Sequence, residues 1–419
     1  MNNPSRRQFL QALAVTAPSI FIANQLRAQA SAAGSPELSP YPEAWLPEGI
    51  KSRYVDEVNG LRMHVLEAGH TQTNAPALIL LHGFPELAYS WRKVMLPLAQ
   101  AGYHVLVPDL RGYGRTTGWS SDYDTDLAPF RMLNKVRDVI GLIYAYGYRH
   151  VNAVIGHDFG SPLAAWCAVT RPDIFQSVVM MSAPFSGTPS IPFDTINNPN
   201  SANAEGPDIY ADLANLPRPR KHYQRYYTTR DANDNMWHAS QGLSNFIRAY
   251  YHHKSADWEQ NRPFRLAART AEEWSKMPTY YIMDLAEGMA ETVAKEMPAP
   301  EQVAANTWLT DAELAVYTTE FERTGFQGGL NSYRMGATGL GAAEAQIYTG
   351  KTIDQPSLFL SGASDWGTYQ NPGAFERMQE TACTDMRGVH LVDGAGHWLQ
   401  QEQPEEVSRL VLAFLDSIN

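Results

Sequence analysis

The chain has 419 residues, of which 44% are hydrophobic and 18% charged, a composition typical of a soluble globular protein and not of a largely disordered one. Its formal net charge of -11 argues against a nucleic-acid partner, because phosphate binding needs clustered lysine and arginine. The densest basic run, Arg218-Pro219-Arg220-Lys221, is interpreted as a solvated loop. Of the two cysteines, Cys167 lies in a predicted buried helix, so we expect Cys167 and Cys383 to be free thiols.

Residues 1–30 have the features of an export signal. Arg6 and Arg7 precede a short apolar run over residues 12–23, and Ala28-Gln29-Ala30 offers a small-residue cleavage site. This pattern resembles a twin-arginine signal peptide, with a linker over residues 31–50. The apolar run is too short to span a bilayer. We therefore expect the twin-arginine export machinery as a partner, no stable membrane anchor, and a periplasmic or secreted protein. A basic amphipathic first helix is the alternative.

The next segment predicts a β-hairpin followed by a buried parallel sheet. Asn59-Gly60 stands between two alternating runs, which is a strong signal for a two-residue hairpin turn. Short apolar runs then alternate with helical stretches, as is typical of an α/β fold whose parallel strands are covered by helices. The predicted strands are Ala77 to Leu81, Val105 to Val107, Val151 to Ile155, Val178 to Met181, Ser357 to Leu360 and Val389 to Val392.

A helical cap is predicted to interrupt the α/β core. Between residues 186 and 345 the pattern turns helical without intervening strands, so we assign residues 51–185 and 346–419 to the two parts of the core. Within the cap, Thr310 and Glu313 have the spacing of a capping box at the start of a helix. A closed cap would exclude water from a site at the carboxyl edge of the sheet.

Gly156-His157-Asp158-Phe159-Gly160 has the form of a nucleophile elbow between a strand and a helix. Small residues two before and two after Asp158 allow the chain to approach itself in so sharp a turn. The helix that follows contributes partial positive charge, which favours a carboxylate. Taken alone the pattern is weak, because an aspartate that caps a helix would look the same.

Three further segments complete a catalytic constellation. His82-Gly83-Phe84-Pro85-Glu86 follows a strand, and the N–H groups of Phe84 and Phe159 could form an oxyanion hole. His397, on a glycine-flanked loop, is the predicted general base, and Asp365 follows another strand, where it could hold the imidazole tautomer. The order of nucleophile, acid and histidine is that of α/β-hydrolases.

An aspartate nucleophile indicates chemistry at saturated carbon. A carboxylate can displace a leaving group there and form an alkyl ester with the enzyme. His397 would then activate water for attack on the Asp158 ester, while the oxyanion hole stabilises the second half-reaction. No cofactor and no metal is needed for these two steps.

At this point the chain resembles a soluble epoxide hydrolase of the α/β-hydrolase superfamily, over nearly all of residues 51–419. The resemblance rests on residues 82–86, Ser90-Trp91-Arg92, residues 109–114, the Asp158 elbow and Gly396-His397-Trp398. It implies a mostly parallel eight-stranded sheet with an inserted α-helical cap, a hydrophobic epoxide and water as reactants, and a vicinal diol as product. It also implies a cis peptide bond between Phe84 and Pro85.

In that family two cap tyrosines bind the epoxide oxygen, and Tyr223 and Tyr333 are similar to them. A phenol that protonates the oxygen lowers the barrier, because ring opening otherwise releases an alkoxide. Tyr226 and Tyr227 stand close enough to Tyr223 to be confused with it. The chain departs from the family in having Phe159 where tryptophan is common after the nucleophile, and in a longer cap around residues 255–300.

Two other functions remain as alternatives. A haloalkane or haloacid dehalogenase would use the same aspartyl ester, although the tyrosine pair and Phe159 disfavour it. A non-catalytic ligand-binding protein could keep the pocket, although the intact triad speaks against it. Residues 231–236 begin like a calcium loop but lack the glycine and the closing glutamate. His252 and His253 point to different sides of a helix, so a cap surface or pocket rim is favoured over a metal site.

Overall fold

An eight-stranded sheet forms the centre of the protein, in the order β1-β2-β4-β3-β5-β6-β9-β10. The computed structural model describes residues 38–70, 75–190 and 208–418. The chain divides into two units between Ser39 and Pro40, and the following concerns the second unit. Its sheet strands are β1 Lys51–Val58, β2 Leu61–Ala68, β3 Ala77–Leu81, β4 His104–Pro108, β5 Ala153–His157, β6 Val178–Met181, β9 Ser357–Gly362 and β10 Met386–Val392.

The predicted mostly parallel sheet with an antiparallel start is confirmed. β2 pairs antiparallel with both β1 and β4, whereas the pairs from β4 through β10 are parallel. Asn59 and Gly60 join β1 to β2, and both have positive φ angles, 50° and 80°. These values belong to the hairpin turn that matches the twist of two strands. Every residue of β3, β4, β5, β6 and β9 is buried, as expected for a sheet whose two faces are both covered by helices.

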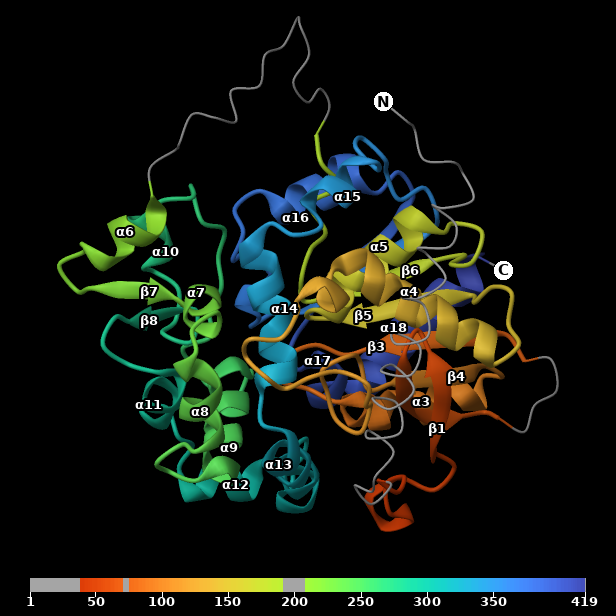
Figure 1. Ribbon diagram of the computed structural model, residues 1–419, viewed down its shortest axis with the longest axis horizontal. Helices are drawn as coiled ribbons and strands as arrows, with labels where there is room; N and C mark the ends of the chain where they lie inside the picture. The colour runs from red at the N-terminus through yellow and green to blue at the C-terminus, as the bar shows by residue number, and fades with distance from the viewer. Residues whose placement is uncertain (1–37, 71–74, 191–207, 419) are drawn as a thin grey trace, which may run out of the picture. The chain divides into compact units, whose positions relative to one another are not determined.

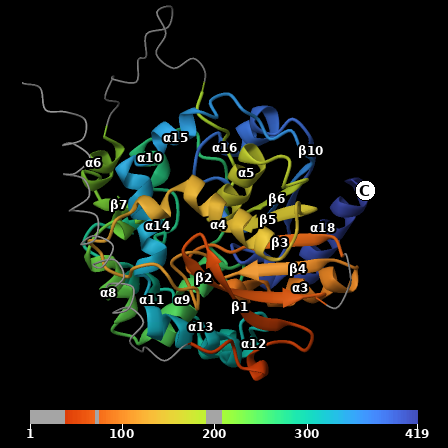
Figure 2. The same cartoon turned by 45° about the vertical axis from the view of Figure 1, so that its right-hand side comes forward.

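Helices cover both faces of the sheet. α4 (Met132–Ala145) contacts α5 (Gly160–Thr170), and α3 (Arg92–Gln100) contacts α18 (Pro404–Ile418) on the other face (Figure 2). Smaller elements are α16 Ala374–Arg377, α17 Leu399–Glu402, the short 3-10 helices Glu43–Trp45, Ala88–Trp91, Ala128–Phe130 and Trp366–Thr368, and the π-helix Met378–Ala382. Cys167 and Cys383 are buried free thiols, as predicted. Among the described helices, none combines the length and the apolar character needed to cross a bilayer.

Helices dominate the segment between β6 and β9. Figure 1 shows α8, α9 and α11 to one side of the sheet, with α14 between them and the strands. The helices are α6 Ile209–Ala214, α7 Tyr223–Tyr227, α8 Asp231–Trp237, α9 Leu243–Lys254, α10 Ala271–Trp274, α11 Met289–Ala294, α12 Pro300–Ala305, α13 Asp311–Thr324, α14 Gln327–Thr338 and α15 Ala342–Gln346. The predicted capping box of Thr310 and Glu313 starts α13.

The prediction of a cap without strands is wrong. β7 (Arg220–His222) and β8 (Ile282–Asp284) pair antiparallel. Each strand has three residues, which is too few for an alternating pattern to appear in the sequence. The interpretation of the basic run as a solvated loop is also wrong for Arg220, because its Nε donates to the carbonyl of Ile282 at 2.8 Å from a buried position.

His252 and His253 do not lie on the cap surface. Both side chains are buried, and the His253 ring packs against the rings of Trp258 and Tyr280, with centroids 4.4 and 4.7 Å away. The segment after α9 folds back over the end of the helix, which the helical pattern alone did not reveal. Within the described ranges no group of three His, Cys, Asp or Glu side chains is arranged to hold a metal ion.

The cap approaches the core backbone to backbone at the start of α14. A Cβ atom on Gly328, at the start of α14, would lie 2.0 Å from the carbonyl oxygen of Gly112. A Cβ atom on Gly112 would lie 2.5 Å from the carbonyl oxygen of Gly328. Only glycine at both positions allows this contact, which fixes the start of α14 against the core. Tyr333 lies in the same helix.

Candidate active site

Asp158 occupies the sharp turn between β5 and α5. Its φ of 52° lies in the left-handed region, which is strained for a residue other than glycine and costs about 1–3 kcal/mol. A Cβ atom on Gly156 would lie 1.9 Å from the carbonyl oxygen of Gly160, and one on Gly160 would lie 2.2 Å from that of Leu81. The two glycines therefore permit the turn that projects Asp158 from the carboxyl edge of the sheet.

The topology brings the other predicted segments to the same edge. Leu81 pairs with Gly156, and Met181 with His157, so parallel neighbours end side by side. The loops after β3, β5, β9 and β10 carry Phe84, Asp158, Asp365 and His397, respectively. The peptide bond between Phe84 and Pro85 is cis, as expected. The Phe84 N–H donates to Asp158 Oδ1 at 2.8 Å. Phe159 follows directly as the N-cap of α5.

His397 bridges two carboxylates. Its Nε2 lies 3.3 Å from Asp158 Oδ2, and its Nδ1 lies 3.1 and 3.2 Å from the two carboxylate oxygens of Asp365. Asp365 also accepts the Gly367 N–H at 2.7 Å, and it is fully enclosed. A proton on Nδ1 shared with Asp365 leaves the Nε2 lone pair facing Asp158. Asp158 keeps 14% of its side chain exposed and is thus open to a reactant.

Each member of this triad has a perturbed pKa. Burial favours the neutral acid in Asp158, but His397 and Lys254 outweigh it and hold the pKa well below its usual range. The pKa of Asp365 is likewise lowered, since His397 and the Gly367 N–H outweigh the effect of burial. Burial and Lys254 lower the pKa of His397, yet Asp365 and Asp158 raise it more, so the net direction is upward.

The two predicted tyrosines lie near each other and near the turn that carries the nucleophile. Tyr223 begins α7 and Tyr333 lies in α14, with ring centroids 6.0 Å apart. The Tyr333 ring meets that of Phe159 edge-on at 4.5 Å. Burial raises the pKa of both phenols, and the charge of Asp158 raises each further. Each hydroxyl is therefore protonated near neutral pH and can donate a hydrogen bond.

Tyr226 and Tyr227 do not compete for this position. The Tyr226 hydroxyl donates to Asn235 Oδ1 at 2.7 Å, and the Tyr227 hydroxyl donates to that of Tyr250 at 3.1 Å. The Tyr223 hydroxyl lies 3.2 Å from Gln224 Nε2 and 3.4 Å from Gln370 Oε1. Tyr226 and Tyr227 thus have other hydroxyl partners, and Tyr223 remains the predicted counterpart of the family's first tyrosine.

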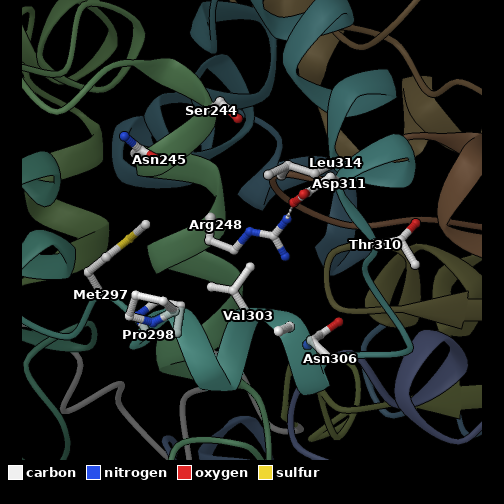
Figure 3. A pocket seen from close by; sticks show the side chains of 12 residues that line it. Ser244, Asn245, Arg248, Met297, Pro298, Val303, Asn306, Thr310, Asp311 and Leu314 are labelled. Atoms are coloured by element: carbon white, nitrogen blue, oxygen red, sulfur yellow. Dashed lines mark hydrogen bonds and ion pairs between the residues drawn. The ribbon is translucent and has the colours of Figure 1, made fainter.

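A pocket of about 400 Å³ leads to Phe159 and Tyr333. Its other lining residues come mostly from α6, α7 and α14, and they are Tyr210, Gln224, Arg225, Thr228, Ser332, Gly336 and Ala337. A separate hollow of about 570 Å³ lies between α9, α12 and α13 (Figure 3). Arg248 points into that hollow and pairs with Asp311 at 2.5 Å. None of the predicted site residues lines that hollow, whereas Phe159 and Tyr333 line the pocket of about 400 Å³.

Three polar residues of the site were missed by sequence reasoning. Lys254, the last residue of α9, is buried beside the triad. Glu402 accepts the N–H groups on both sides of His397, from Gly396 and Trp398, each at 2.9 Å. Burial raises the pKa of Glu402 to about 7, although these N–H groups favour the carboxylate. Gln400 Nε2 donates to Glu86 Oε1 at 2.8 Å. No local motif marks any of the three.

His157 contacts the backbone of the general base. Its Nε2 donates to the carbonyl of His397 and its Nδ1 contacts Glu86 Oε2, both at 2.6 Å. Arg111 forms a bidentate ion pair with Asp138 at 2.7 and 2.8 Å.

The chain is similar to known hydrolases in both sequence and structure. The family described as alpha/beta hydrolase fold matches residues 76–404. Epoxide hydrolase B of Mycobacterium tuberculosis is 34% identical over 366 residues, covering 86% of this chain and 96% of the relative. An epoxide hydrolase from an endophytic Streptomyces superposes with a TM-score of 0.69 at 29% identity, covering 88% of this chain and 96% of the other. Potato (Solanum tuberosum) epoxide hydrolase I gives 0.65 at 27%, covering 88% and 99%.

Proposed function

The chain belongs to the alpha/beta hydrolase fold family, and we propose that it is an epoxide hydrolase that forms a covalent ester on Asp158. The observation that carries this proposal is the position of the Asp158 carboxylate, which lies 3.3 Å from the His397 imidazole. The next residue, Phe159, packs against Tyr333, whose ring lies 6.0 Å from that of Tyr223. The similarity to epoxide hydrolases over more than four fifths of the chain supports it.

The first half-reaction opens the ring. An Asp158 carboxylate oxygen attacks one epoxide carbon, and the carbon–oxygen bond of the ring breaks. Tyr223 and Tyr333 donate hydrogen bonds to the ring oxygen, and one phenol transfers its proton to that oxygen as the bond breaks. The product of this step is a hydroxyalkyl ester of Asp158. The lowered pKa of Asp158 keeps the nucleophile ionised across the physiological range.

The second half-reaction releases the diol. His397 Nε2 takes a proton from water, and the water oxygen attacks the carbonyl carbon of the Asp158 ester. The N–H groups of Phe84 and Phe159 stabilise the oxyanion that forms. The ester bond to the alkyl oxygen then breaks, and that oxygen takes the remaining proton of the attacking water as Asp158 returns to its carboxylate. The vicinal diol leaves, and the proton on His397 returns to the tyrosinate. No cofactor or metal takes part in either step.

The two cap tyrosines favour an epoxide over a halide as the reactant. A halide leaves without a proton, so a haloalkane dehalogenase gains nothing from a phenol at the leaving group. Phe159, which stands after the nucleophile, has no N–H on its ring to bind a halide ion. Both features make dehalogenation the weaker candidate.

Trapping the ester tests the proposal. The His397→Gln variant should form the ester but hydrolyse it slowly, so intact-mass spectrometry after exposure to styrene oxide should show a gain of the whole substrate mass. The adduct should map to the Asp158 peptide and be absent from the double variant with Asp158→Asn. A gain only with 1-bromobutane, smaller by the mass of HBr, would identify a dehalogenase. No gain with either probe would indicate a binding protein.

We also propose that residues 1–30 direct export through the twin-arginine machinery, to the periplasm or beyond the cell. Arg6, Arg7 and the small residues at 28–30 support this proposal, and they lie outside the described residues. The exported protein should begin at Ser31, and the variant Arg6→Lys with Arg7→Lys should keep the uncut chain in the cytoplasm. A full-length N-terminus on the wild-type protein would contradict export by cleavage.

A further inference from the structure

Lys254 places a buried ammonium beside the triad. It ends α9, and only 4% of the residue is exposed. Its Nζ faces four aromatic rings, with distances to the ring centroids of 5.3 Å for Trp398, 5.4 Å for Tyr281, 5.6 Å for Tyr250 and 5.8 Å for Tyr280. Contacts of this kind stabilise a cation through the negative faces of the rings. We call these four rings the Lys254 cage.

No carboxylate pairs directly with this ammonium among the residues that the structure describes. Instead the charge acts from a distance on Asp158, Asp365 and Glu86. Burial lowers the pKa of Lys254, and the three carboxylates oppose that effect. A cation held by rings rather than by one carboxylate keeps its full field for the neighbouring site.

Lys254 is also fixed to the loop of the general base. Its carbonyl accepts the backbone N–H of His397 at 2.9 Å. A Cβ atom on Gly396 would lie 2.6 Å from the same carbonyl oxygen, so the end of α9 and the His397 loop are in close contact. These backbone contacts therefore hold the Lys254 side chain, which the cap contributes, beside the His397 loop.

We propose that Lys254 is a positioning residue whose charge opposes protonation of His397, so that the imidazole can accept a proton from water in the second half-reaction. The inference rests on the proposed function. In the free enzyme two carboxylates, Asp158 and Asp365, attract a proton to His397. The Lys254 charge counteracts them.

Several charged groups surround the His397 imidazole besides Lys254. Asp158 and Asp365 contact its two nitrogens, the His157 ring lies 5.0 Å away, and Glu86 acts through His157. The two carboxylates already raise the pKa of His397 with Lys254 present, and without Lys254 they would raise it further and favour an imidazolium. An imidazolium cannot accept a proton, and its ion pair would weaken the nucleophile at Asp158. The positive field of Lys254 thus serves both half-reactions.

Replacing the charge should shift the titration of the imidazole. In Lys254→Met, the acidic limb of the pH profile for turnover of styrene oxide should move upward by about one pH unit, because a nearby positive charge is lost. An NMR titration of histidine-labelled protein should show the same shift for His397, identified by its absence in His397→Gln. Lys254→Arg retains the charge and should keep the wild-type midpoint.

Lys221→Met is the matched control. Lys221 is another cap lysine over an aromatic ring, with its Nζ 4.8 Å from the Tyr226 centroid, and it is not among the main charges that act on His397. Its removal should leave the His397 midpoint unchanged. An unchanged midpoint in Lys254→Met, with only slower turnover, would overturn the proposal and leave Lys254 a packing residue. Because the NMR titration needs no substrate, it decides this question even if the wild-type protein fails to hydrolyse epoxides.

Discussion

Two carboxylates flank the His397 imidazole, and each has a different role in the proposed cycle. Asp158 changes from a carboxylate to an ester and back, whereas Asp365 keeps its charge throughout. Asp365 is held by His397 and by the Gly367 N–H, and its burial leaves no solvent to screen it. It both orients the ring and raises the pKa of His397.

Replacing Asp365 with asparagine should therefore change activity and pH dependence together. The loss of a negative charge destabilises the imidazolium, so the acidic limb of the pH profile should move to lower pH, opposite in direction to Lys254→Met. The plateau rate should fall on the order of 10³-fold, because the wrong tautomer becomes accessible. A steady-state pH profile measures both effects. An upward shift of the limb would contradict the role given to Asp365.

The phenol of Tyr333 should matter in ring opening and not in ester hydrolysis. Tyr333→Phe keeps the ring contacts with Phe159 but loses the proton donor, so formation of the ester should slow by about 10²–10³-fold. Stopped-flow measurements of a single turnover separate the two steps. Tyr226→Phe is the control, since its hydroxyl is already bonded to Asn235, and its ester formation should match the wild-type rate. Equal ester formation in Tyr333→Phe would exclude this residue as the acid.

The strand-turn-helix around Asp158 depends on backbone contacts that one added methyl group would break. Gly160→Ala would place a Cβ atom 2.2 Å from the carbonyl oxygen of Leu81, so the turn must shift, and we expect a loss of about 3 kcal/mol in the free energy of unfolding. Gly336→Ala, at an exposed position within α14 with no atom in contact range, should instead gain up to about 1 kcal/mol. Urea unfolding of both variants checks the contrast.

Elements with local signals could be predicted from the sequence, and elements defined by distant contacts could not. The Asn59-Gly60 turn, the short apolar strands and the Thr310 capping box each need only their own residues. β7 and β8 form because two short segments meet some sixty positions apart along the chain. Lys254 comes close to the triad because the end of α9 contacts the His397 loop, and no sequence pattern around position 254 predicts that contact.

The cap and the core of the second unit are connected by buried charges as well as by the two facing glycines. Arg92, in α3 of the core, is 2% exposed and pairs with Glu313 of α13 at 2.7 Å. Its guanidinium also donates to Gln401 Oε1 at 2.9 Å and to the carbonyl of Trp308 at 3.2 Å. One side chain thus joins the start of α13 to the segment just after His397. A well-seated cap is what excludes bulk water from the Asp158 ester.

Removing Arg92 should loosen this connection. Arg92→Met keeps most of the side-chain volume but leaves buried acceptors without donors, so we expect a loss of about 3 kcal/mol in the free energy of unfolding. Hydrogen exchange in α13 should accelerate more than in β5, because the cap loses an anchor while the sheet does not. The neighbouring Lys93 pairs with the same Glu313 at 3.3 Å but is 24% exposed, so Lys93→Met should cost less than about 1 kcal/mol. Equal losses of unfolding free energy in Arg92→Met and Lys93→Met would mean that the burial of Arg92 contributes nothing to holding the cap. Hydrogen exchange that accelerates equally in α13 and β5 would mean that Arg92 stabilises the core and not the cap in particular.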